Sequence, residues 1–241
     1  MVLVENNSKE AAFHFAAEEL FTRYLRISEP VLMLWQTEKT VMIGSNQVVD
    51  AEVDTEFASE SAIQIVRRSS GGGAIYTDLG TVLYTVMQPL TTETKAVREE
   101  VAASVITALK KMGVPAEREG RNDILIDGKK ISGFAQYTSV KHVCTHGSLL
   151  YDTDLDTLTD VLIAHEQKLH PKGIRSIRSR VTNIKPYLKD DLTVEEFIKE
   201  MKNNLLDGVE YTSYVLSPEE NVKINSIRNE KYANPKWNLR M

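Results

Sequence analysis

The sequence predicts an α+β fold in which mixed or antiparallel β-sheets are flanked by helices. Segments rich in β-branched and aromatic residues come in neighbouring pairs instead of alternating singly with helices, which argues against a doubly wound parallel sheet. Residues 94–112 and 193–205 repeat apolar residues at helical spacing. Apolar residues form 42% and charged residues 26% of the 241 residues, which is typical of a soluble globular protein. Without a visible linker or repeat, residues 1–241 are expected to form a single domain.

The first 112 residues are predicted to form three helices and a group of strands. Asn7 and Glu10 are typical of a helix start, and apolar residues then recur at helical spacing up to Tyr24. Two apolar segments after Pro30 are predicted to pair as strands across a short polar turn. The expected elements after the first helix are strands at 31–35 and 40–44, a short helix at 50–61, strands at 63–66, 74–76 and 81–87, and a helix at 94–112.

The second half of the chain is predicted to add a hairpin, three helices and two further strands. Asp127-Gly128 is typical of a tight hairpin turn. Thr193 and Glu196 have the spacing of a capping box, and Ser217-Pro218 is typical of the start of a last helix. The expected elements are a hairpin at 123–135, a strand at 142–151, a helix at 155–165, a helix at 193–205, a strand at 209–216 and a helix from 218.

Composition and motifs argue against several classes of protein. The net charge of −5 argues against a nucleic-acid binder, and no run of about 18 apolar residues that could span a membrane is present. The N-terminus lacks the pattern of a signal peptide, so a cytoplasmic protein is expected. A lone cysteine, Cys144, excludes an internal disulfide. The sequence has no G-x-x-x-x-G-K-[ST], G-x-G-x-x-G, H-E-x-x-H or G-x-S-x-G motif, which argues against common nucleotide sites, zinc hydrolases and serine hydrolases.

Residues 67–80, RRSSGGGAIYTDLG, place three consecutive glycines between two predicted strands. Glycine is unfavourable inside a sheet unless a bulge, a left-handed turn or a closely approaching ligand requires it. Arg68 adds a cation next to backbone amides that no side chain covers, and both groups suit an anion. The alternative is that the triplet is an ordinary turn.

Further polar motifs are consistent with an anionic ligand that carries phosphates. GRND (residues 120–123) brings the carboxylate of Asp123 to the start of a strand, where it could hold Mg²⁺ against the phosphates. GKKISG places Lys130 just after the hairpin turn, and THG places His146 beside a glycine. Residues 167–189 contain seven cations and no acid. Each motif also has a purely structural explanation. Asp123 could be a cap, and the basic residues 167–189 could form an ordinary solvated surface.

Taken in order, these motifs resemble the lipoate–protein ligase A family, within the biotin and lipoate ligase superfamily. The resemblance runs from about residue 31 to residue 184, and YANPKWN (residues 232–238) resembles the end of the family's large domain. It implies the class II biotin/lipoate ligase catalytic fold, without the small C-terminal domain of typical bacterial members. The matching segments are VLMLW…TVMIGSNQ, RRSSGGGAIYTDLG, GRNDILIDGKKISGFAQ, THGSLLYDTDLD and KGIRSIRSRVTN.

The resemblance implies a two-step reaction. Lipoate attacks the α-phosphate of ATP in the presence of Mg²⁺, which gives lipoyl-AMP and pyrophosphate. A lysine of a lipoyl-accepting domain then takes the lipoyl group as an amide. The implied acceptors are the E2 subunits of 2-oxoacid dehydrogenases or the glycine cleavage H protein, and a separate small accessory subunit is a further implied partner. Residues 172–183 match a segment that is expected to fold over the adenylate.

The resemblance also assigns roles to individual residues. Lys130 matches the family's essential catalytic lysine, whereas Lys129 is expected to point to solvent because successive residues of a strand face opposite sides. Asp123 matches the acid associated with Mg²⁺. The residues that match the ATP and lipoyl-AMP site are Arg68, Ser70, Gly71, Gly72, Gly73, Tyr76, Asn122, Asp123, Lys130, His146, Arg178 and Arg180. Those that match the lipoate pocket are Trp35, Gly73, Tyr76 and His146.

Differences from the family leave two alternatives open. The chain has Thr77 and Thr81 where the family usually has histidine and asparagine, and Ser45 where arginine is common. The first alternative is an octanoyl- or lipoyl-transferase of the same fold that works through a cysteine thioester, for which Cys144 is the only candidate nucleophile. The second is a non-catalytic or partner-dependent subunit that binds lipoate.

Overall fold

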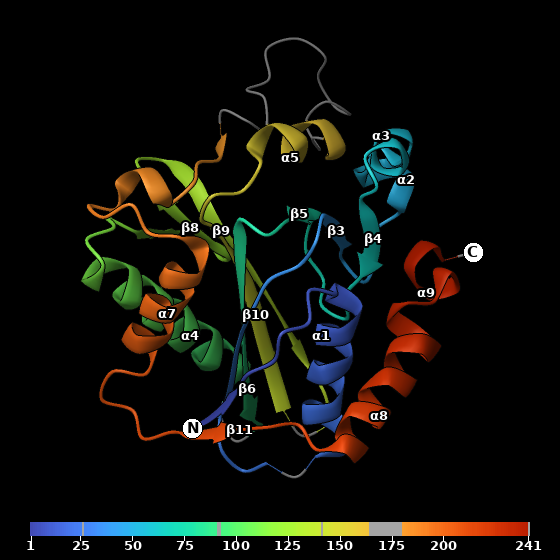
Figure 1. The fold of residues 1–241 in the computed structure, drawn as a ribbon, viewed down its shortest axis with the longest axis horizontal. Coiled ribbons are helices and arrows are strands. Elements are labelled where there is room, and N and C mark those ends of the chain that lie inside the picture. The colour runs from blue at the N-terminus through green and yellow to red at the C-terminus, as the bar shows by residue number, and fades with distance from the viewer. Residues whose placement is uncertain (26, 91–92, 141, 164–179, 241) are drawn as a thin grey trace.

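The computed structural model describes residues 1–25, 27–90, 93–140, 142–163 and 180–240 (Figure 1). Within these residues the strands form one eight-stranded sheet and one three-stranded sheet, and helices lie on both faces of the larger sheet. The larger sheet contains both parallel and antiparallel neighbours. The predicted α+β class, with mixed sheets flanked by helices, is therefore confirmed.

The large sheet has its longest strands at its centre. β6 (Thr81–Pro89), β10 (His142–Leu150) and β9 (Lys129–Thr138) follow one another in antiparallel order. Their register places His146 of β10 directly opposite Thr85 of β6. The outer strands are β11 (Thr212–Tyr214), β1 (Val2–Val4) and β2 (Val31–Trp35) beside β6, and β8 (Asp123–Ile126) and β7 (Glu117–Glu119) beside β9.

The small sheet consists of β3 (Thr40–Ile43) between β4 (Gln64–Arg67) and β5 (Ile75–Thr77). The predicted pairing of residues 31–35 with 40–44 is wrong, because β2 pairs with β1 and β6 while β3 pairs with β4 and β5. All four residues of β3 are buried, and both of its backbone edges are paired, one with β4 and one with β5. The glycine loop, defined as residues 68–74, connects β4 to β5.

Helices cover the two faces of the large sheet and enclose two apolar cores (Figure 1). α1 (Ala11–Glu19) and α8 (Pro218–Ile227) pack together on one face. α4 (Thr94–Lys111), whose bounds agree with the predicted helix, packs with α7 (Val194–Leu205) on the other. Leu83 of β6 belongs to the core under α1. This face also carries the site described below.

Local signals predicted some element boundaries correctly and one helix start wrongly. Asp127 and Gly128 both adopt left-handed backbone angles, with φ of 50° and 72°, so the hairpin turn is confirmed. The capping box at Thr193 is also confirmed. The first helix begins at Ala11 and not near Asn7. The side chains of Asn6 and Ser8 accept hydrogen bonds from nearby backbone amides in this segment, and such bonds compete with helix formation.

The helix predicted over residues 50–61 is divided into α2 (Val49–Glu52) and α3 (Thr55–Glu60). Asp54 causes the division, because its carboxylate accepts the amide of Phe57 at 2.9 Å and so caps a new helix. The preceding residue, Val53, is extended and bridges to Leu162.

Two predicted elements are shorter in the structure. α5 (Leu155–Val161) ends before the predicted limit at residue 165, and residues 164–165 lie outside the described part of the chain. β11 covers three of the predicted residues 209–216 at an edge of the sheet. Among the helices that the structure describes, none combines the length and the apolar character that a membrane crossing requires.

Candidate active site

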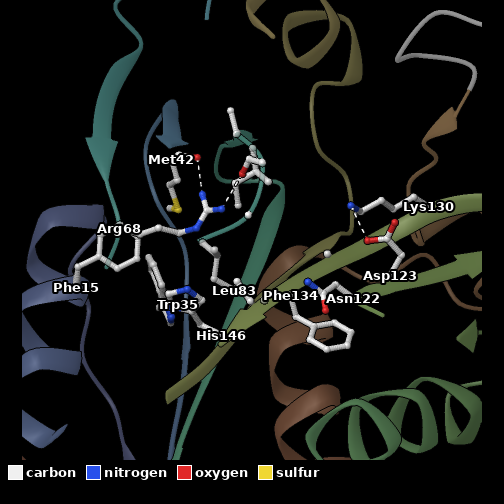
Figure 2. Close-up of a pocket in the computed structure, with 17 residues that line it drawn as sticks. Phe15, Trp35, Met42, Arg68, Leu83, Asn122, Asp123, Lys130, Phe134 and His146 are labelled. Atoms are coloured by element: carbon white, nitrogen blue, oxygen red, sulfur yellow. Dashed lines mark hydrogen bonds and ion pairs between the residues drawn. The ribbon is translucent and has the colours of Figure 1, made fainter. Parts of the chain in front are cut away.

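Two adjoining cavities lie where the glycine loop meets β9 and β10. The narrow cavity has a volume of about 160 Å³ and the wide cavity about 540 Å³. The two cavities meet at the residues that line both of them, which are Gly73, Ala74, Ile75, Asp123, Lys130 and Gly133. The large apolar side chains that line the narrow cavity are Ile75 and the five labelled in Figure 2, Phe15, Trp35, Met42, Leu83 and Phe134.

The glycine loop bends closely around the end of β3. Gly72 has a φ of +98°, a left-handed conformation that side chains disfavour. A Cβ on Gly44 would lie 2.3 Å from the carbonyl oxygen of Gly72, so a side chain there would displace the loop. Within the glycine triplet, the left-handed turn at Gly72 is the reason that the sequence pattern required, whereas a Cβ on Gly71 or Gly73 would meet no atom within 4 Å.

Arg68 is enclosed by the loop that it begins. Its side chain is buried, with 5% exposure of the residue. The guanidinium donates to the carbonyl oxygens of Met42, Gly71 and Gly73 at 2.8, 2.9 and 2.7 Å, and its Nε donates to Oγ of Ser70 at 3.1 Å. Burial lowers the pKa of Arg68 to about 10, which leaves it a cation at neutral pH. Arg68 thus shapes the loop and places a positive charge at the wall of the narrow cavity.

Lys130 and Asp123 form an ion pair at the junction of the two cavities (Figure 2). Nζ of Lys130 lies 2.8 Å from Oδ1 of Asp123, and the side chains are 37% and 43% exposed. An ion pair this exposed is weak enough for a ligand with phosphates to open it. Lys129 is exposed and lines neither cavity, as strand alternation predicts.

Asn122 presents an acceptor at the narrow cavity. Its Oδ1 is buried and has no hydrogen-bond partner among the described residues. Its backbone carbonyl accepts the amide of Phe134 at 3.0 Å, which holds it against β9. A buried amide oxygen without a partner is unfavourable until a ligand donor or a cation supplies one. The amide oxygen of Asn122 and the carboxylate of Asp123 are the kind of oxygen ligands that Mg²⁺ accepts. Asn122 and Asp123 therefore fit a magnesium ion.

His146 lines the narrow cavity and belongs to a buried polar network. Its Nε2 lies 2.6 Å from Oγ of Ser70, and its Nδ1 lies 2.9 Å from Oε1 of Glu18 in α1. Glu18 is not among the site residues that the sequence motifs predicted. The signal that could have found it is its position three residues after Phe15, on the apolar side of a predicted helix, where a carboxylate needs a polar partner.

The aromatic residues predicted for the lipoate pocket lie in different cavities. Trp35 lines the narrow cavity, and its indole Nε1 donates to Oγ1 of Thr85 at 3.1 Å. Tyr76 is buried beside the wide cavity and does not line the narrow one that Trp35 and His146 share. The structure therefore brings Trp35 and His146 together and separates Tyr76 from them.

The remaining predicted residues lie around the same cavities. Gly72 and Gly73 line the narrow cavity, whereas Ser70 is buried behind its wall. Gly71 is exposed and lines neither cavity. Arg180 lines the wide cavity. Arg178, with most of the segment 172–183, lies outside the described residues.

Cys144 lies on β10 and lines neither cavity. It is fully buried, and this burial, together with the nearby carboxylate of Glu18, raises the pKa of its thiol well above the ordinary value. A thioester nucleophile has to form a thiolate that the substrate can reach. The position of Cys144 therefore argues against the transferase alternative and agrees with a buried structural cysteine.

Comparison with known proteins decides the family. Residues 10–206 match the lipoyl protein ligase A/B catalytic domain. This chain belongs to that family. The lipoate-protein ligase LplJ of Bacillus subtilis (strain 168) is 34% identical over 242 residues, which cover 99% of this chain and 73% of that protein. Lipoate–protein ligase 1 of Staphylococcus aureus (strain Mu50 / ATCC 700699) is 32% identical over 233 residues, which cover 97% of this chain and 71% of that protein.

A solved structure shares the fold of this lipoyl protein ligase family member. The structure, described as a bi-partite lipoate protein ligase and its E2 lipoyl domain from Thermoplasma acidophilum, superimposes with a TM-score of 0.87 and 25% identity. The alignment covers 99% of this chain and 95% of that one. The predicted catalytic fold of the lipoate ligases is confirmed, and the residues of both cavities lie within the part that matches the family.

Proposed function

We propose that this chain is an ATP-dependent lipoate–protein ligase that converts lipoate to lipoyl-AMP and transfers the lipoyl group to a lysine of a lipoyl-accepting domain. One observation carries the proposal: a narrow cavity with apolar walls and a wide cavity meet at Lys130 and Asp123. An acyl chain suits the first cavity and a nucleotide the second, so that carboxylate and α-phosphate come together at the junction. The relatives in Bacillus subtilis and Staphylococcus aureus, both named lipoate-protein ligases, support this substrate.

The first step requires two anionic groups to approach each other. An oxygen of the lipoate carboxylate forms a bond to the α-phosphorus, and the bond from this phosphorus to the pyrophosphate oxygen breaks. Lys130 supplies a cation at the junction, and Arg68 supplies one at the wall of the narrow cavity. Cations that are in place before the reaction stabilise the negative charge that develops on the phosphate oxygens. No covalent bond to the protein is needed.

Asp123 and Asn122 would hold Mg²⁺, which would supply positive charge to the ATP phosphates. In the free protein the carboxylate of Asp123 is paired with Lys130. Entry of ATP offers Lys130 the triphosphate, which carries more negative charge than the carboxylate, and the movement of Lys130 toward it would leave the carboxylate available to the cation. The ion pair thus keeps both side chains at the junction until ATP arrives.

The second step transfers the lipoyl group to a protein. The amine of the acceptor lysine forms a bond to the lipoyl carbonyl carbon, AMP leaves with the electron pair of the broken bond, and the amine loses a proton. The Thermoplasma acidophilum ligase is described with its E2 lipoyl domain, which supports E2 domains as acceptors, and the H protein is proposed beside them. That ligase is described as bi-partite, which supports a small accessory subunit as a further partner. The cytoplasmic location stays a prediction from the sequence.

Pyrophosphate release and acceptor mass test this function. The chain is incubated with ATP, Mg²⁺ and either lipoate or octanoate, with and without a lipoyl domain and a small accessory subunit. Lipoate is expected to release pyrophosphate, and the lipoyl domain is expected to gain the mass of one lipoyl group. Absence of pyrophosphate under all these conditions would contradict the proposal. Acyl transfer from a thioester donor without ATP would instead support the transferase alternative.

A further inference from the structure

A chain of buried hydrogen bonds connects Arg68 in the glycine loop to Glu18 in α1. Nε of Arg68 donates to Oγ of Ser70 at 3.1 Å, and this Oγ lies 2.6 Å from Nε2 of His146. Nδ1 of His146 lies 2.9 and 3.1 Å from the two carboxylate oxygens of Glu18. None of the four residues is more than 6% exposed. Three elements far apart in sequence are thereby joined behind the wall of the narrow cavity.

The donor and acceptor types show that the hydrogen bonds are donated in one direction, from Arg68 toward Glu18. A carboxylate only accepts, so Nδ1 of His146 carries the proton that Glu18 accepts. The hydroxyl of Ser70 accepts from Arg68, which only donates, and a buried hydroxyl needs an acceptor for its own proton. Nε2 of His146 is that acceptor. The orientation of each group therefore depends on the next, and the last acceptor is Glu18.

Glu18 is held from a second side by the large sheet. Oγ1 of Thr85 donates to its Oε1 at 2.8 Å, and Nε1 of Trp35 donates to Thr85 at 3.1 Å. Trp35 and His146 both line the narrow cavity, so Glu18 connects two parts of its wall although it lines neither cavity. The hydrogen-bond partners of Arg68 among the described residues are carbonyl oxygens and Ser70. Glu18 is therefore the terminal acceptor of the hydrogen-bond chain that begins at Arg68.

We propose that Glu18 is a positioning residue of the active site, which orients His146 and, through Ser70, the guanidinium of Arg68 and the glycine loop. The expected effect of Glu18 on the kinetics of adenylate formation rests on the proposed function. Its effect on the orientation of His146 is a property of the free protein and does not depend on that function. Ser70, His146 and Glu18 have the order of a nucleophilic serine triad. Ser70 is fully buried and lines neither cavity, so a substrate does not reach its hydroxyl. The three groups orient the site and do not attack.

Histidine ring ¹⁵N NMR of the free protein tests the positioning directly. The wild type is expected to show His146 with its proton on Nδ1, and Glu18→Gln is expected to keep it, because the amide oxygen still accepts. Glu18→Ala is expected to lose this signature and to shift the amide signals of residues 71–73. Glu19→Gln is the matched control, since Glu19 is also buried on α1 but pairs with Lys231. It should leave the signals of His146 unchanged.

The kinetics of adenylate formation test the consequence. Glu18→Ala is expected to lower kcat/KM for the acid by about 10- to 100-fold, the loss that misplaced groups produce. The KM for the acid should rise while that for ATP changes little, because Arg68 and His146, the two members of the network that line a cavity, line only the narrow one. Glu18→Gln should stay within about threefold of the wild type. The losses from Glu18→Ala and Ser70→Ala should combine less than additively, because both interrupt one chain.

The outcomes separate this inference from the proposed function. A wild type that forms no adenylate contradicts the function, and the NMR result still decides the positioning. A folded Glu18→Ala variant with an unchanged His146 signature, or with wild-type kcat/KM in an active enzyme, overturns the inference. Equal rises in the KM for acid and for ATP, or fully additive losses with Ser70→Ala, also overturn it. If Glu18→Ala does not fold, Ser70→Ala serves as the test. It is expected to raise the KM for the acid more than the KM for ATP, and equal changes in the two KM values overturn the inference.

Discussion

Arg67 and Trp237 exchange two hydrogen bonds: Nε of Arg67 donates to the carbonyl oxygen of Trp237 at 3.0 Å, and the indole of Trp237 donates to the carbonyl oxygen of Arg67 at 2.8 Å. Arg67 is fully buried, and its amide donates to Oδ1 of Asn238 at 2.9 Å. Arg67 directly precedes the glycine loop. The short helix α9 (Pro235–Leu239), close to the end of the chain, therefore supports the start of that loop.

Asn238→Ala is expected to lower the free energy of unfolding by about 1–3 kcal/mol, because it leaves the buried amide of Arg67 without an acceptor. Urea unfolding measures the change. Lys236→Ala, an exposed position on the same helix, is the control and should stay within about 0.5 kcal/mol of the wild type. Equal stabilities of the two variants would show that α9 does not support the loop.

Lys130→Ala is expected to reduce adenylate formation by at least about 100-fold, because it removes the cation at the junction of the two cavities. Lys129→Ala is the control and should keep most of the activity, since Lys129 is exposed on the neighbouring position of β9. Pyrophosphate release measures both. Similar losses in the two variants would mean that the catalytic side of β9 is assigned wrongly.

Arg180→Ala is expected to weaken the binding of lipoyl-AMP by about tenfold and that of lipoate much less, because Arg180 lines the wide cavity only. Isothermal titration with each ligand gives the two affinities. Arg180→Lys, which keeps the charge, should recover part of the loss. Equal weakening for both ligands would contradict the separate use of the two cavities.

Cys144→Ser is expected to leave lipoyl transfer largely intact, because the thiol is buried away from both cavities. Mass spectrometry of the acceptor domain measures the transfer. The same method applied to the wild-type enzyme should find no acyl group on Cys144. An adduct there, combined with loss of transfer in a folded Cys144→Ser variant, would favour the transferase mechanism.

The stability of the protein is expected to fall in mild acid because of His14. Burial lowers the pKa of His14 to about 4, and its ring stacks on Trp35 with centroids 4.2 Å apart. In the unfolded chain the pKa of this histidine is near 6.5, so the unfolded state binds more protons between pH 6.5 and 4. The free energy of unfolding should therefore decrease as the pH falls through this window, by an amount on the order of 3 kcal/mol.

Urea unfolding at a series of pH values between neutral and about 4 measures this effect. His14→Phe removes the titrating group and keeps an aromatic ring against Trp35, so its stability should vary less over the window. A variant whose stability changes with pH as steeply as that of the wild type would show that other groups cause the dependence.

Elements that depend on neighbours along the chain could be predicted from the sequence. The helix over residues 94–111, the turn at Asp127-Gly128 and the capping box at Thr193 follow from apolar spacing, backbone preference and side-chain caps, which act within a few residues. The ordered motifs around Arg68 and Lys130 likewise indicated the family correctly, because they carry the site's chemistry in short segments.

Which distant segments meet could not be predicted from local patterns, because it depends on the packing of the whole chain. β2 and β3 are close in sequence but belong to different sheets, and each of them pairs with strands that lie farther away along the chain. Glu18 lies 128 residues before His146, and Tyr76 and Trp35 line different cavities. The spacing of apolar residues shows that a side chain is buried, but the residues that it contacts depend on how all the helices and strands pack together.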